Sequence, residues 1–145
     1  MNKEEYGKMV KKVSPPSKKI RDFLLAFLVG GTICTIGQLI KELCLYCGLN
    51  EKLSGIIVSS SLISIAALLT GLKIFEKIAK HAGAGTLVPI TGFANAVVAP
   101  AIEFKTEGFI LGVGAKMFTI AGPVIVYGTV ASVVYGIIYW ITTLF

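Results

Sequence analysis

A single lysine stands in the last long apolar stretch of this chain. Lys116 is the only charged residue in the 38 residues from Gly108 to Phe145. A charge at membrane depth is costly, and such residues usually face a bundle interior or a watery cavity. Lys116 could therefore supply positive potential to a path for an anion, or it could lie at the membrane boundary and extend its ammonium into water. The sequence leaves both interpretations open.

A second set of polar side chains lies in a stretch rich in glycine and proline, residues 82–102. Irregular backbone at membrane depth is tolerated only where protein or a watery cavity covers it. We therefore predict two half-helices that meet near residues 89–92 and either cross the membrane or re-enter on the same side. Half-helix amino termini direct N–H dipoles at anions. Residues in this stretch that either line a path or pack against a neighbouring helix are Thr86, Pro89, Thr91, Gly92 and Asn95.

Two further polar residues border the apolar stretches. Gln38 lies near the end of the first one, and Glu103 follows the third, where it could bind calcium or pair with Lys105. Both are candidates for a solute path. If such a path passes through this chain, Lys116, Thr91 and Asn95 should line one cavity.

Five glycines are candidates for close helix contacts. Small residues let helix backbones approach, and a bundle that slides to open needs contacts without large interlocking side chains. The candidates are Gly30, Gly31, Gly108, Gly112 and Gly122.

Other residue patterns argue against enzymatic chemistry. Cys44 and Cys47 have CxxC spacing, but a zinc site would need two more ligands and there is no second pair. They remain either a redox pair or small apolar residues at a membrane boundary. The glycines near residue 84 are not followed by the Gly-Lys-Ser/Thr of a nucleotide loop. We expect no enzyme, no cofactor and no bound metal.

The elements that position these residues follow from composition. The chain has 145 residues, 54% hydrophobic and 15% charged, and a mean hydropathy of +0.80. Soluble domains carry about 25% charged residues. Uncharged stretches of the length needed to cross a bilayer occur four times. We predict an all-α integral membrane protein whose single membrane domain, residues 22–145, has about four spans: 23–40, 53–72, 82–102 (broken) and 117–140.

The last stretch is too long for one perpendicular span. Either a short helix through Lys116 precedes a span of about 118–140, or Gly122-Pro123 kinks one long tilted helix.

The amino-terminal tail, residues 1–21, holds seven basic residues against Glu4 and Glu5. The positive-inside rule places it in the cytoplasm, with anionic lipid as a partner. Apart from Tyr6, the tail has no aromatic residue interleaved with its basic residues, so nucleic acid is not an expected partner. Residues 1–14 fit a short interfacial helix, ended by Pro15-Pro16, with one apolar side. That side consists of Tyr6, Met9, Val10 and Val13.

Three runs of sequence resemble the stage V sporulation A membrane family of AC/AE type. They are residues 30–38, 83–95 and 108–118, and the resemblance extends over nearly the whole chain. It implies a multi-pass protein of the inner forespore and spore membrane that moves dipicolinic acid, with calcium, during sporulation and germination.

The resemblance further implies a channel subunit that responds to membrane tension within a hetero-oligomer. Its expected partners are the AE membrane protein and the soluble, dipicolinate-binding AD protein of the same family system. The alternative is a non-conducting membrane scaffold that docks the soluble partner.

Overall fold

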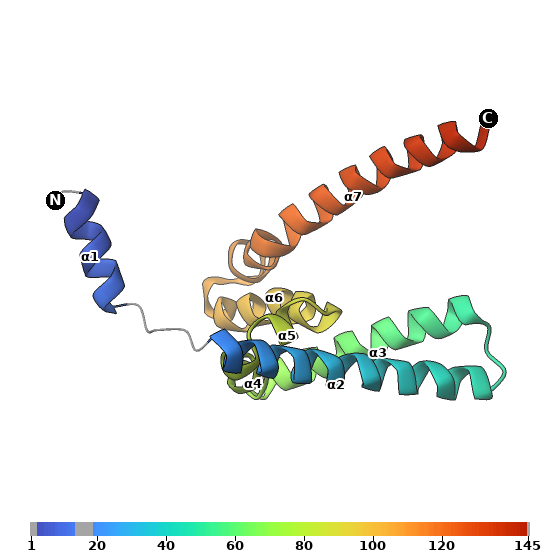
Figure 1. The fold of residues 1–145 in the computed structure, drawn as a ribbon, viewed down its shortest axis with the longest axis horizontal. Helices are drawn as coiled ribbons and strands as arrows, with labels where there is room; N and C mark the ends of the chain where they lie inside the picture. The colour runs from blue at the N-terminus through green and yellow to red at the C-terminus, as the bar shows by residue number, and fades with distance from the viewer. Residues whose placement is uncertain (1–2, 14–18, 145) are drawn as a thin grey trace.

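The computed structural model describes residues 3–13 and 19–144, and the regular elements in these residues are all helical. This confirms the all-α prediction. In chain order the elements are α1 (Lys3–Val13), α2 (Lys19–Tyr46), α3 (Glu51–Gly71), α4 (Phe75–Ala82), α5 (Ala84–Leu87), α6 (Ile90–Glu103), the 3₁₀ turn η1 (Lys105–Glu107), the π-helical segment η2 (Phe109–Gly114) and α7 (Ala115–Leu144), as Figure 1 shows.

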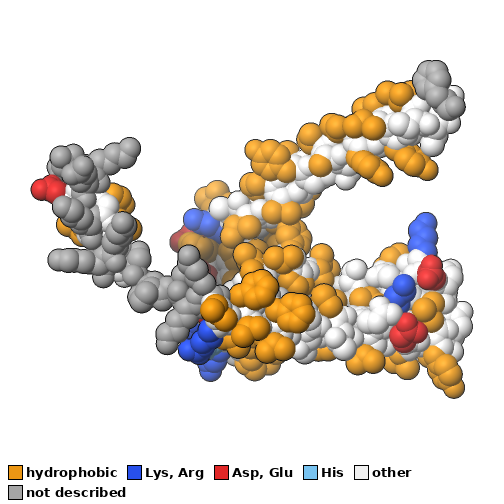
Figure 2. All heavy atoms as spheres, viewed as in Figure 1, with side chains coloured by type: hydrophobic (Ala, Val, Ile, Leu, Met, Phe, Trp, Pro, Cys, Tyr) orange, Lys and Arg blue, Asp and Glu red, His pale blue; other side chains and the backbone are white. Residues whose placement is uncertain are grey.

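Within residues 3–13 and 19–144, three helical segments are long and apolar enough to cross a membrane: Ile20–Tyr46, Glu51–Gly71 and Phe109–Leu144. Figure 2 shows hydrophobic atoms along these helices and charged side chains gathered toward the ends of the α2–α3 pair. The third predicted span, 82–102, is divided among shorter helices. Its longest piece, α6, has 14 residues and rises about 21 Å, which is less than the roughly 30 Å of hydrocarbon in a bilayer.

The segment from α4 to α6 begins and ends at the same end of the bundle. Glu103, the last residue of α6, lines one cavity with Lys73 and Glu76, which lie where α3 ends and α4 begins. Figure 1 shows α6 running back toward α4. We call this end the basic end, and the end with the α2–α3 turn, residues 47–50, the hairpin end. Of the two alternatives that the sequence leaves open, the structure has the re-entrant one.

The chain reverses at Val88 and Pro89. Pro89 is extended, with φ −64° and ψ 165°, and precedes the first turn of α6. Because Pro89 has no N–H to donate to α5 and its own backbone is extended, α5 ends here and α6 starts afresh. The reversal lies near the predicted junction at residues 89–92.

Close backbone contacts hold the re-entrant segment against α2. A Cβ atom built on Gly85 would collide with the carbonyl group of Ala26, and a Cβ on Gly30 would lie 3.3 Å from the carbonyl oxygen of Gly85. A Cβ on Gly92 would collide with the Leu87 carbonyl. Only glycine fits at Gly85 and Gly92 without a shift of the backbone.

Helix α7 leaves the bundle after its first turns. Its buried residue is Ala121, near the start of the helix, which packs beside α6, and residues 123–144 are exposed along their whole length. Figure 1 shows α7 diverging from the α2–α3 pair. The helix continues through Pro123 and follows directly on η2. Of the two alternatives for the last stretch, the structure therefore has one long helix through Gly122-Pro123, not a short helix before a separate span.

Candidate functional site

A polar cavity of about 540 Å³ lies between α3 and α6 at the basic end. One face of α6 carries a residue at every fourth position. These residues are Thr91, Asn95, Ala99 and Glu103. Three of these residues line the cavity together with the end of α3 and the start of α4. The lining residues are Thr70, Lys73, Glu76, Asn95, Ala99, Ile102 and Glu103.

A threonine and an asparagine meet across the two helices in this cavity. The Thr70 hydroxyl lies 3.0 Å from Asn95 Oδ1 and 2.7 Å from the carbonyl oxygen of Ala66, so its single proton is shared between two acceptors. Thr70 is 9% exposed, whereas Asn95 is half-buried. This contact joins the end of α3 to the middle of α6 through polar atoms.

Charged side chains surround the mouth of the cavity. Lys73 adopts a left-handed backbone conformation, with φ 57°, and its N–H donates to the carbonyl of Thr70. An L-residue in this conformation is strained by about 1 kcal/mol. Lys73 lines the cavity together with Glu76 and Glu103. The mouth therefore offers one ammonium and two carboxylates to a solute.

Thr86 and Thr91 line a different cavity. It measures about 300 Å³ and is bounded mainly by aliphatic side chains of α2 and α3. The Thr86 hydroxyl donates to the carbonyl of Gly83 over 3.0 Å, and that of Thr91 to the carbonyl of Thr86 over 3.4 Å. Both residues are buried, and their hydroxyl groups stabilise the turn between α5 and α6.

Lys116 lines none of the cavities described here. Its ammonium lies 4.3 Å from the ring centroid of Phe104, a cation–π contact, and the side chain is half-buried. Among the cavities described here, Asn95 and Thr91 line separate ones and Lys116 lines neither. A solute path past Asn95 would therefore exclude Lys116 and Thr91. Because η1 and η2 reverse the chain directly after α6, the first turn of α7 lies beside Phe104 at the basic end and not at mid-membrane.

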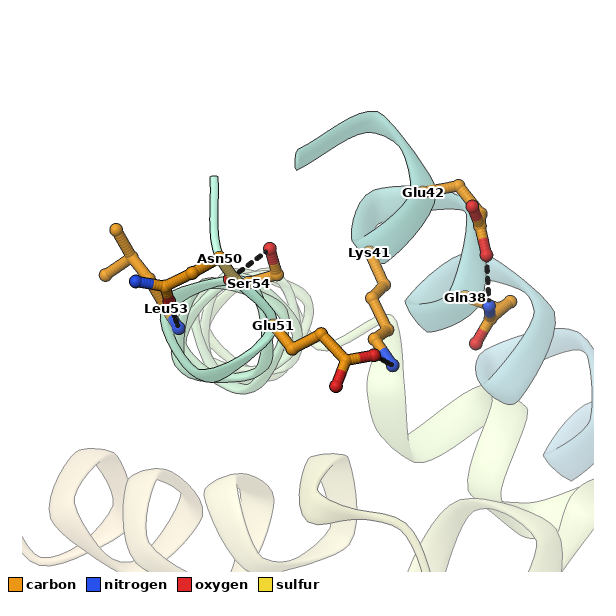
Figure 3. Close-up of polar contacts among 7 residues, drawn as sticks. All are labelled: Gln38, Lys41, Glu42, Asn50, Glu51, Leu53 and Ser54. Atoms are coloured by element: carbon orange, nitrogen blue, oxygen red, sulfur yellow. Dashed lines mark hydrogen bonds and ion pairs between the residues drawn. The ribbon is translucent and has the colours of Figure 1, made fainter. Parts of the chain in front are cut away.

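Gln38 lies at the other end of the bundle. It borders a groove of about 720 Å³ between α2 and α3, which also includes Lys41, Glu51 and Lys52. Figure 3 shows Gln38 Nε2 donating to Glu42 Oε1, and Lys41 reaching across to Glu51. Gln38 and the Asn95 cavity therefore lie toward opposite ends.

Pro89 lines a shallow recess of about 340 Å³ beside Gly30 and Gly31 of α2. Six of the eight predicted path residues are thus distributed over four separate cavities. Asn95 and Glu103 share one of them, and Thr86 and Thr91 share another.

The glycines predicted to pack closely fall into two groups: some make close contacts and others do not. Gly30 contacts α5, and a Cβ on Gly112 would collide with the carbonyl of Phe104. A Cβ on Gly31 would meet open space and one on Gly122 would meet only its own helix. Gly108 has φ 97°, so it is required by the turn before η2 rather than by packing.

Three charged or polar residues of the cavity were not predicted from the sequence. They are Thr70 in α3, Lys73 between α3 and α4, and Glu76 in α4. A threonine at the end of an apolar stretch and two charged residues after it form no sequence pattern that predicts a shared cavity. Among the described residues, no group of three or more His, Cys, Asp or Glu side chains could hold a metal ion.

The three apolar helices, the re-entrant segment and the polar cavity define a multi-pass α-helical membrane protein. Residues 22–138 match the profile of the SpoVAC/SpoVAEB sporulation membrane protein family. The chain is also 45% identical over 137 residues to stage V sporulation protein AC of Bacillus subtilis (strain 168), covering 94% of this chain and 91% of that protein. The chain belongs to the SpoVAC/SpoVAEB family. No solved structure matches it.

Proposed function

We propose that this chain is a channel subunit for dipicolinic acid, with calcium, across the inner forespore and spore membrane during sporulation and germination. The polar cavity between α3 and α6 carries the proposal. A membrane anchor needs neither a re-entrant segment nor a polar cavity between its helices, and irregular backbone within a bilayer is costly unless protein or water covers it.

The size and depth of the cavity suit a small polar solute. Small-molecule sites commonly enclose about 300–1,000 Å³, and this cavity measures about 540 Å³. Asn95 precedes the end of α6 by eight residues, so the cavity extends about 12 Å along the helix from the basic end. The ammonium of Lys73 and the amide of Asn95 would meet carboxylates, and Glu76 and Glu103 would meet the calcium ion.

The buried residues Ala66, Phe75 and Ala94 pack into a small core, with Ala66 and Ala94 adjoining the Thr70–Asn95 contact. In the proposed channel this core closes the path next to Asn95. Opening requires the re-entrant segment to move relative to α2 or α3. The contact of Gly85 with Ala26 contains no interlocking side chains, which supports opening by sliding under membrane tension.

The proposed channel is a hetero-oligomer with the AE and AD proteins. One chain leaves α7 exposed from residue 123 onward, and its re-entrant segment reaches only part of the way across the bilayer. An AE membrane protein beside α7 would complete the wall. The positive-inside rule places the basic end in the cytoplasmic core, where the soluble AD protein would meet it.

The alternative is a non-conducting scaffold. The exposed lysines of α4, Lys77 and Lys80, favour it because they form a basic surface on which a soluble partner could dock.

Dipicolinate efflux from liposomes that carry the protein tests the proposal. We expect release above that of empty liposomes, increased by osmotic downshift, and reduced about ten-fold or more in an Asn95→Leu variant. Leucine fills a similar volume and removes the polar partner of Thr70. The contact between α3 and α6 then becomes less polar, and a charged solute loses the amide group of Asn95.

Two variants serve as controls. Ser64→Ala removes a hydroxyl that bonds only within α3, and release should stay within two-fold of the unaltered protein. Lys116→Glu reverses a charge that lines none of the cavities described here, and release should continue. If the chain alone gives no release, the AE and AD proteins are added. Absence of release with both partners present would leave the scaffold as the function.

A further inference from the structure

Helix α1 has an apolar side that nothing in the described structure covers. Tyr6, Met9, Val10 and Val13 are 57%, 55%, 42% and 79% exposed. Positions 6, 9, 10 and 13 differ by three, four and seven residues, so they share one side of the helix. A short helix with such a side is not stable alone in water and requires an apolar surface to lie on.

The charge of α1 identifies the kind of surface. The helix sequence contains four lysines and two glutamates, and Lys18, Lys19 and Arg21 follow. Helical spacing puts positions 8, 11 and 12 away from the apolar side. A helix with one apolar side and a basic remainder binds at the boundary between headgroups and acyl chains of an anionic bilayer.

The basic end of the same chain is a poor alternative surface. Arg21, Lys73, Lys77 and Lys80 are exposed there, and like charges would repel the lysines of α1. The match to the family profile begins at residue 22, so α1 lies outside the residues that the profile covers.

We propose that α1 is a peripheral anchor that lies flat on the anionic leaflet at the basic end, with Tyr6, Met9, Val10 and Val13 among the acyl chains. The helix of 11 residues is about 17 Å long. Residues 14–18 separate it from α2, a length that spans at most about 17 Å. Helix α1 therefore stays at the leaflet where α2 enters the membrane. The proposal is independent of the solute that the protein carries.

Tryptophan fluorescence of the full chain in vesicles tests this placement. Trp140 is the only tryptophan, so a Trp140→Phe background allows one reporter at a time. Met9→Trp places the reporter on the apolar side, and Lys11→Trp is the matched control on the other side. Each variant is reconstituted with lipids brominated on the acyl chain, in phosphatidylcholine alone or with phosphatidylglycerol.

We expect strong bromolipid quenching and a blue shift for Met9→Trp in vesicles with phosphatidylglycerol, and weak quenching for Lys11→Trp in the same vesicles. Each lysine near an anionic surface favours binding by about five-fold. Quenching of Met9→Trp should therefore fall in phosphatidylcholine alone, and also after Lys8→Gln and Lys12→Gln are combined in it.

Three outcomes would overturn the proposal. Equal quenching of the two reporters would mean that α1 is not oriented by its apolar side. If quenching of Met9→Trp is the same with and without phosphatidylglycerol, and is also unchanged by the lysine replacements, charge does not select the surface. A blue shift without bromolipid quenching would mean that α1 packs on protein, either a second copy of the chain or a partner.

Discussion

The contact of α5 with α2 depends on single glycine residues. Gly85 meets the Ala26 carbonyl so closely that no Cβ fits, whereas Gly31, on the neighbouring surface of α2, faces open space. The two positions therefore respond in opposite ways to the same added methyl group.

We predict that Gly85→Ala destabilises the protein by about 1–3 kcal/mol because the backbones must separate. Gly31→Ala should be neutral or stabilising by up to about 1 kcal/mol, since alanine favours the helix and meets nothing. Unfolding of the two variants in detergent, followed by circular dichroism, measures both. Equal effects would contradict the close α2–α5 contact.

The irregular backbone of the re-entrant segment could be predicted from the sequence, but the roles of its individual residues could not. The run of glycines and prolines indicated irregular backbone. Whether Thr91 lines a path or bonds to the Thr86 carbonyl depends on where the α5–α6 turn places its hydroxyl group. The cavity around Asn95 needs Thr70 and Lys73 from another helix, and their meeting is a property of the packing.

At the scale of elements, the helices extend beyond the apolar stretches that predicted them. The predicted span 23–40 became α2, Lys19–Tyr46. The hydrogen bond from Gln38 to Glu42 spans one turn, so charged residues continue the helix past the hydrocarbon. Hydropathy locates the part of a helix inside the membrane, whereas hydrogen bonds and turns such as that at Gly48, with φ 83°, set its ends.

The start of α3 depends on its cap. The side chain of Asn50 accepts from the backbone N–H of Leu53 at 2.8 Å, and the buried Ser54 hydroxyl donates to the Asn50 carbonyl at 2.9 Å. Figure 3 shows these contacts.

We predict that Asn50→Ala lowers the free energy of unfolding by about 1 kcal/mol, because an N–H at the helix start loses its acceptor. Asn50→Asp should retain the stability, since a carboxylate accepts the same bond. Denaturant titration in detergent checks both variants. A loss as large in Asn50→Asp as in Asn50→Ala would show that the cap is not the cause.

At the scale of the whole molecule, re-entry changes which connectors share a side of the membrane. If 82–102 crossed, residues 104–108 would lie with the hairpin end. Because Glu103 instead lines a cavity with Lys73 and Glu76, Lys105 joins the lysines of α4 at the basic end. Counting charges along the sequence could not decide this, because a broken apolar stretch of 21 residues has the same composition whether it crosses or returns.

Single cysteine reporters distinguish the two topologies. We predict that Thr106→Cys reacts with a membrane-impermeant maleimide from the same side as Lys77→Cys, and from the side opposite to the native Cys47, in sealed vesicles of known orientation. Thr106, Lys77 and Cys47 are all exposed. Cys34 and Cys44 are replaced by serine throughout, and Cys47 is kept only as the reporter of the hairpin end. Labelling of Thr106→Cys together with Cys47 would mean that the 82–102 segment crosses the bilayer. The cavity at Asn95 would then have no mouth shared by α3 and α6, and the proposed solute path would have to lie elsewhere.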